Sequence, residues 1–269
     1  MRMKSIGWMA AGLIVVSAMG CREERLTRAE AQEALEEAQL AGQAATLIAS
    51  SADLSTNFTI GGAVEAAADE LRSFIGSQLP CAQITLSAAT LTVEYGALAG
   101  SCTYRGQTYS GTHAISVMRN ETSQVVVNHT FSELSNGAIS VSGTAIVTWS
   151  FSNPSRHIEH ELVWTRLSDG RQGVGTGDRL QTPLAEGLLV GIEIDGTRTW
   201  SGESGEWALD IDGVQVRWID LVPQAGTYTL ETPFGKTLTL SFLRTSPTQI
   251  QVTVTNGVDE FQFNVPTLR

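Results

Sequence analysis

Two histidines, His113 and His129, are the residues whose type and spacing could most readily do chemistry. Both share the odd-numbered phase of the apolar residues around them, so they are expected on the apolar faces of neighbouring strands. A five-residue loop over 119–123 and a three-residue loop over 135–137 would place His113 opposite His129, and His129 opposite Gly143. Such a pair beside a glycine could bind a metal ion or a small polar ligand. The alternative is two interior histidines held by hydrogen bonds, and because no third ligand falls in this row, no metal site is predicted.

Three other segments look like chemical motifs but have the wrong spacing or context. Residues 157–161 read HIEHE, without the helical HExxH spacing of a zinc protease; on a strand edge the two histidines would point to opposite faces. Residues 202–205 lack the final glycine and the strand-to-helix context of a serine hydrolase. Residues 173–177 are glycine-rich, but no helix follows to bind phosphate, so a flexible turn is expected. We therefore predict no catalytic residues, no cofactor and a protein that is not an enzyme.

The first 21 residues have the pattern of a secretory signal. A charged start precedes an apolar run over 6–18, which is too short to span a bilayer as a helix. The sequence Ala-Met-Gly-Cys at 18–21 resembles the lipobox of bacterial lipoproteins, with alanine where that motif usually has leucine. The resemblance implies cleavage before Cys21, acylation of its thiol and attachment to a membrane of the bacterial envelope. Arg22, in place of aspartate, favours the outer membrane under the enterobacterial sorting rule.

The chain has three cysteines. If Cys21 carries lipid, Cys81 and Cys102 remain as an even pair in an exported, oxidising compartment, which predicts a disulfide between them. The alternative, two free thiols or metal ligands, lacks the close CxxC spacing that zinc sites usually show.

Two helices are expected before residue 80. Thr27 and Glu30 have the spacing of a capping box, and an alanine-rich helix follows to about residue 51. Its large apolar residues are few, which favours a spacer or a weakly docked helix. The second helix has a stronger apolar stripe over 64–79, able to pack on a sheet, and Pro80 stops it.

From residue 84 onward, apolar residues alternate with polar ones, and Asn-Gly and Asp-Gly turns separate the segments. This pattern predicts a mainly β protein: an antiparallel meander sheet, as a curved sheet, a sandwich or an open barrel, with the N-terminal helical segment packed on it. The expected division is a signal peptide over 1–20, a lipidated tether over 21–27, a helical segment over 28–80 and the β domain over 81–269.

Part of the chain is also similar to β-rich lipoproteins of Gram-negative bacteria that have no assigned activity. The similarity covers about residues 55–150 and rests on the segments 79–81, 90–96 and 102–111. It implies no activity and no site residues.

Charge limits the partners. Without residues 1–20 the chain keeps 15 basic and 28 acidic residues, a net charge of −13. Such a protein is a poor candidate for nucleic acid or for anionic lipid headgroups. The expected function is a membrane-anchored, non-enzymatic lipoprotein that binds or scaffolds an envelope protein. The alternative is a carrier that binds an apolar ligand or lipid within a curved sheet.

Overall fold

The computed structural model describes residues 25–267, except 105, 188–189, 218–219 and 221. The predicted signal peptide and Cys21 lie outside the described residues. The helices are α1 (Arg28–Asp53), a short 3-10 turn η1 (Leu54–Thr56) and α2 (Val64–Gln78). The strands are β1 (Gln83–Ser87), β2 (Thr90–Tyr95), β3 (Thr103–Tyr104), β4 (Gln107–Thr108), β5 (Ser110–Asn120), β6 (Gln124–Ser135), β7 (Ile139–Ser150), β8 (Ser155–Arg166), β9 (Gln172–Pro183), β10 (Gly191–Gly202), β11 (Gly205–Arg217), β12 (Ala225–Glu231), β13 (Thr237–Ser246), β14 (Gln249–Thr255) and β15 (Glu260–Pro266).

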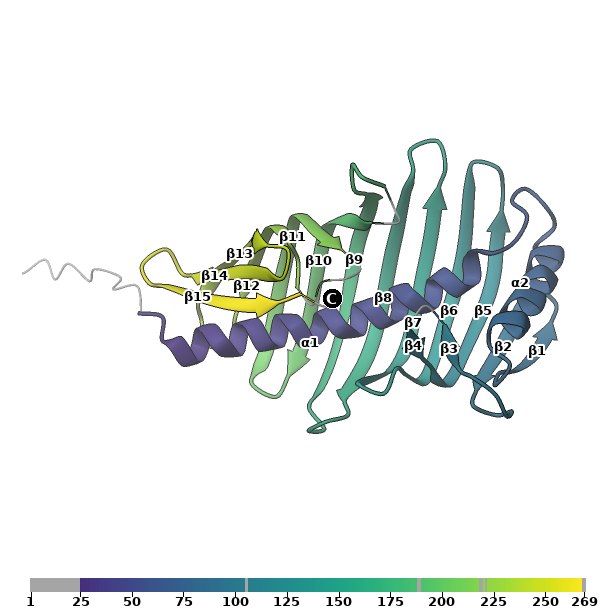
Figure 1. Ribbon diagram of the computed structural model, residues 1–269, viewed down its shortest axis with the longest axis horizontal. Helices are drawn as coiled ribbons and strands as arrows, with labels where there is room; N and C mark the ends of the chain where they lie inside the picture. The colour runs from purple at the N-terminus through teal and green to yellow at the C-terminus, as the bar shows by residue number, and fades with distance from the viewer. Residues whose placement is uncertain (1–24, 105, 188–189, 218–219, 221, 268–269) are drawn as a thin grey trace, which may run out of the picture.

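The predicted antiparallel meander is confirmed. In the described part of the chain, 13 strands form one sheet in the order β1-β2-β5-β6 and then consecutively to β15, while β3 and β4 form a separate hairpin. The sheet is open, with β1 and β15 at its two edges. It twists strongly: in Figure 1 the strands near β5 stand almost upright, whereas β15 lies nearly along α1. This twist gives the sheet one hollowed face.

Helix α1 lies across that hollowed face (Figure 1), so the expectation of a spacer or weakly docked helix is wrong. Fourteen of its 26 residues are buried, and eight of these are alanines. Small side chains let the helix approach the sheet closely, so α1 becomes part of the core although it carries few large apolar residues. The Thr27–Glu30 capping box that begins the helix is present as predicted.

Polar contacts fix α1 along its length. The backbone nitrogen of Leu26 donates to Asp259, 2.9 Å away, in the β14–β15 turn. Near the middle, Glu37 pairs with Arg171 and accepts a hydrogen bond from the Trp200 indole at 3.2 Å. These contacts hold the helix in one position over the sheet.

Helix α2 packs against β1, β2 and β5 at the other end of the molecule, as its stronger apolar stripe predicted. Cys81, just after this helix, and Cys102, just before β3, form a disulfide with their Cα atoms 5.3 Å apart. The bond ties the end of α2 to the first hairpins, closing a loop with a sequence separation of 21 residues.

We expect Cys81→Ser to lower the free energy of unfolding by about 3 kcal/mol, because closure of a loop of this length restricts the unfolded chain. Urea unfolding of the variant and of the wild type measures the difference. The double variant Cys81→Ser/Cys102→Ser is the control: reduced wild type should unfold at the same midpoint. If reductant leaves the wild-type midpoint unchanged, the bond contributes no stability.

Candidate binding site between helix α1 and the sheet

The two predicted site histidines are neighbours in the interior. His113 on β5 and His129 on β6 are both buried. Nε2 of His113 lies 2.8 Å from Nδ1 of His129, and the Tyr95 hydroxyl is 3.4 Å from the other ring nitrogen of His113. The three rings therefore form a short hydrogen-bonded chain in the interior of the protein. Binding of a ligand by this pair stays a prediction.

The predicted register of the pair is wrong by two residues. His113 faces Phe131 across β5 and β6, and is diagonal to His129. His129 in turn faces Ala145, while Gly143 faces Phe131. The loop after β5 covers only 121–123, and the register shifts at two points in the β5–β6 pair and at one point in the β6–β7 pair. Because the register differs from the predicted one by an even number of residues, both histidines still lie on the same face of the sheet, as predicted.

Gly143 does not lie opposite His129, and its role differs from the expected one of making room for a histidine ring. Its φ is +134°, and a β-carbon there would lie 2.2 Å from the carbonyl oxygen of Glu161 on the next strand. The glycine therefore permits a close approach of two backbones, which helps the sheet to bend.

Burial keeps these histidines neutral. It lowers the pKa of His129 to about 3, with a further contribution from the positive charge of Arg156. It lowers the pKa of His113 well below the usual value, and the neighbouring His129 adds to the effect. Neither imidazole is therefore a proton carrier near neutral pH.

The HIEHE segment lies on β8. As predicted, its histidines point to opposite faces: His160 is buried, and His157 lies on the outer face with its Nε2 2.5 Å from Asp178. The expectation of a strand edge is wrong, because β8 is paired on both sides, with β7 and β9.

The glycine-rich segment 173–177 is strand β9 rather than a turn. Its three glycines occupy the inward positions of the strand, where a β-carbon would lie within 2.6 Å of a neighbouring side chain. The side chains that fill these places are those of Trp164, Trp200 and His160. The glycines thus make room for large side chains from the adjacent strands.

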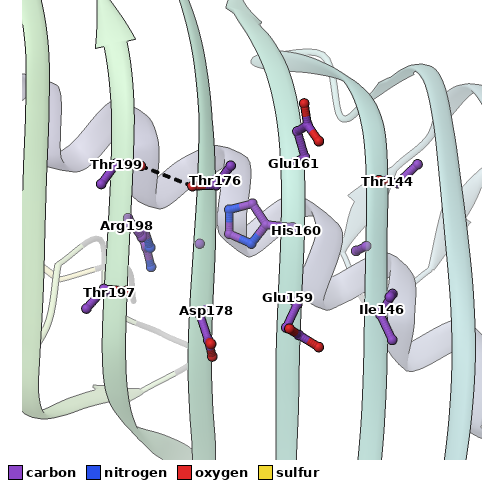
Figure 2. Close-up of a pocket in the computed structure, with 12 residues that line it drawn as sticks. Thr144, Ile146, Glu159, His160, Glu161, Thr176, Asp178, Thr197, Arg198 and Thr199 are labelled. Atoms are coloured by element: carbon purple, nitrogen blue, oxygen red, sulfur yellow. Dashed lines mark hydrogen bonds between the residues drawn. The ribbon is translucent and has the colours of Figure 1, made fainter.

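The outer face of the sheet has a shallow hollow of about 350 Å³ across β7 to β10. Figure 2 shows a row formed by Thr144, Glu161, Thr176 and Thr199, with α1 on the far side of the sheet. The hydroxyl oxygens of Thr176 and Thr199 are 3.0 Å apart. These side chains face water, which already satisfies exposed hydroxyls and carboxylates.

A second cavity, of about 330 Å³, lies on the inner face between α1 and the strands β8 to β13. Its size is within the range of small-molecule sites. The exposed α1 residues Gln43 and Thr46 line it at the solvent side. Apolar side chains form much of the rest: Leu35, Ala38, Ala45, Ala49, Ile192, Ile194, Val216, Val222, Leu240 and Phe242.

Three arginines bring positive charge into this cavity: Arg156 on β8, Arg179 on β9 and Arg198 on β10. Arg156 faces Gln181, two residues from Arg179. Arg179 faces Gly196, two residues from Arg198. The arginines are therefore diagonal neighbours on three consecutive strands, all on the inward face.

Only the first of the three has a carboxylate partner among the described residues. Nη1 of Arg156 lies 2.6 Å from Asp53 of α1, and its Nε donates to Gln181 at 2.8 Å. Arg179 and Arg198, with exposed fractions of 2% and 6%, form no ion pair in the described structure. Nε and Nη2 of Arg179, and Nε and Nη1 of Arg198, are buried without a hydrogen-bond partner there.

The electrostatics of these two groups are unfavourable. Burial lowers the pKa of Arg179 well below its usual range, and the charges of Arg198 and Arg156 lower it further. Burial also lowers the pKa of Arg198. Because a guanidinium hardly ever gives up its proton, the described part of the chain holds two buried charges without a counter-ion.

None of these three arginines is among the site residues predicted from the sequence, although the sequence carries a signal for them. Arg156 is two residues before Ile158, and Arg198 two residues before Trp200, so each occupies an inward position of an alternating strand. Arg179 sits in the same phase as the glycines of β9. A charged residue at an inward position is the pattern to search for.

Comparison of the chain with protein-family models, with curated protein sequences and with solved structures gives no match. Among the described residues, no helix is long and apolar enough to cross a membrane. Nor do three His, Cys, Asp or Glu side chains gather anywhere in that part of the chain so as to hold a metal ion.

Proposed function

We propose that this protein is a lipid-anchored, non-enzymatic binding protein of the bacterial envelope, which carries a ligand with an apolar part. The observation that supports the proposal is the cavity of about 330 Å³ between α1 and the sheet. Apolar side chains share its lining with polar and charged ones, which suits a ligand that has both an apolar part and a polar part. The ligand enters beside Gln43 and Thr46 and lies against α1. Scaffolding of an envelope protein stays a prediction without a specific surface to support it.

Gly42 of α1 offers a direct test, because it lines the cavity and lies over Arg198. A β-carbon at residue 42 would be 4.0 Å from Nη1 of Arg198, an ordinary contact, so alanine fits. A leucine at the same position would extend into the cavity and fill part of it.

We expect Gly42→Leu to weaken binding of the neutral fluorophore N-phenylnaphthylamine on the order of tenfold, by removing apolar contact area. The matched control, Gly42→Ala, should bind as wild type and be more stable by about 1 kcal/mol, because alanine favours the helix. The measurement is fluorophore emission with the full chain in nanodiscs of zwitterionic lipid, with empty nanodiscs subtracted. Equal binding by wild type and Gly42→Leu would contradict a ligand site in this cavity.

The anchor is tested separately. We expect a clickable fatty acid fed to the producing bacteria to label the wild-type protein and not Cys21→Ser, because the thiol of Cys21 is the acylation site that the lipobox resemblance implies. In-gel fluorescence after the click reaction gives the result. Equal labelling of the two proteins would show that Cys21 is not acylated.

A further inference from the structure

Arg179 and Arg198, which have no counter-ion among the described residues, point to the chemistry of the ligand, an inference that rests on the proposed function. We infer that the cavity binds a molecule with one oxyanion headgroup, carboxylate or phosphate, on an apolar tail, and that Arg179 and Arg198 hold the headgroup. The tail then lies against the apolar residues of β10 and β13, such as Ile194, Leu240 and Phe242.

The balance of charge around the cavity supports an anion. Two carboxylates line it, and each has its own arginine: Asp53 pairs with Arg156, and Asp220 pairs with Arg244. Another lining cation, Arg217, pairs with Glu186, 2.8 Å away. In the described part of the chain this leaves two lining cations without a counter-ion, Arg179 and Arg198.

Geometry favours a single shared headgroup. Arg179 and Arg198 are diagonal neighbours on adjacent strands, so both side chains can reach one group of atoms between them. Each guanidinium has two buried nitrogens without a partner in the described structure. A carboxylate or phosphate can accept hydrogen bonds from both guanidinium groups at once, whereas a neutral hydroxyl has fewer acceptor sites and no charge.

Water alone is a poor substitute for the anion. It would satisfy hydrogen bonds but would not neutralise two positive charges that burial has removed from bulk solvent. The net negative charge of the protein does not oppose this inference, because the charges nearest to a group affect it most, and the described lining has four arginines and two aspartates. That the chain avoids anionic headgroups stays a prediction for its surface, whereas the described lining of the cavity carries more positive than negative charges.

The test compares three labelled probes with the same ten-carbon tail: decanoate, decyl phosphate and decanol. Equilibrium dialysis uses the full chain in zwitterionic nanodiscs, with empty nanodiscs subtracted. We expect at least one of the two anions to bind on the order of tenfold more tightly than decanol. The anion that binds more tightly identifies the headgroup as carboxylate or phosphate.

Variants separate this inference from the proposed function. Arg179→Met and Arg198→Met should each weaken anion binding on the order of tenfold and leave decanol binding unchanged. Arg119→Met is the matched control, since it removes an exposed positive charge on β5, and it should bind all three probes as wild type does. Equal binding of anions and decanol, unaffected by the arginine variants, would overturn the headgroup while keeping the apolar site. If no probe binds better to wild type than to Gly42→Leu, both proposals are wrong.

Discussion

Acidification from about pH 7.5 to about pH 5.5 is expected to lower the free energy of unfolding by about 4 kcal/mol. Three buried histidines cause this: burial lowers the pKa of His129 to about 3 and that of His160 to about 2, and His113 also lies well below its usual value. The charges of Arg179 and Arg198 add to the effect on His160, and that of Arg156 to the effect on His129.

The sign follows from proton binding. In the unfolded chain each histidine binds a proton near pH 6.5. In the native state the buried histidines bind a proton only at a much lower pH. Stability is therefore complete above pH 6.5 and is lost progressively as the pH falls toward the folded pKa values. Each histidine contributes about 1.4 kcal/mol to the loss over the stated interval. Because a domain has only about 5–15 kcal/mol of stability in total, the effect is large.

Urea unfolding at several pH values measures this loss. His160→Gln and His129→Gln should each reduce the pH dependence by about a third, because each removes one group that must stay neutral. A stability that is flat between the two pH values would contradict neutral burial of the three histidines.

Much of the sheet could be predicted from the sequence because alternation and turn residues are local signals. Those signals gave the antiparallel order and the shared face of His113 and His129. They could not give the register, because the bulges next to Val117 and Phe131 depend on how neighbouring strands twist. A bulge adds one residue, so the inward positions change from odd to even numbers across it, as from Phe131 to Leu134.

The position of helix α1 and the cavity beneath it could not be predicted from the sequence, for a different reason. An alanine-rich helix has a weak apolar stripe whether it is exposed or buried, so its position depends on the surface that it meets. That surface is the hollowed face of the sheet, which is built from strands far apart in the sequence. The role of Arg179 and Arg198 depends in turn on α1, because the helix covers them and removes them from water.

Replacement of both arginines, Arg179→Met/Arg198→Met, is expected to raise the free energy of unfolding of the ligand-free protein by several kcal/mol. The double variant removes two buried charges that have no counter-ion in the described structure, and methionine has a flexible apolar side chain able to fill the space. Most substitutions of buried residues destabilise a protein, so a gain in stability is a specific expectation.

Urea unfolding of delipidated protein measures the gain, and Arg156→Met provides the contrast. Arg156 is paired with Asp53 and Gln181, so its loss leaves a carboxylate of α1 without this partner and should destabilise the fold. Wild type should recover the deficit when a tightly bound anion is added, whereas the double variant should not respond. If the double variant is less stable than wild type, the two arginines hold the fold together, and their charge is not kept for a ligand. If the double variant is instead more stable than wild type and no longer binds the anion, the two arginines lower the stability of the fold and are needed for binding.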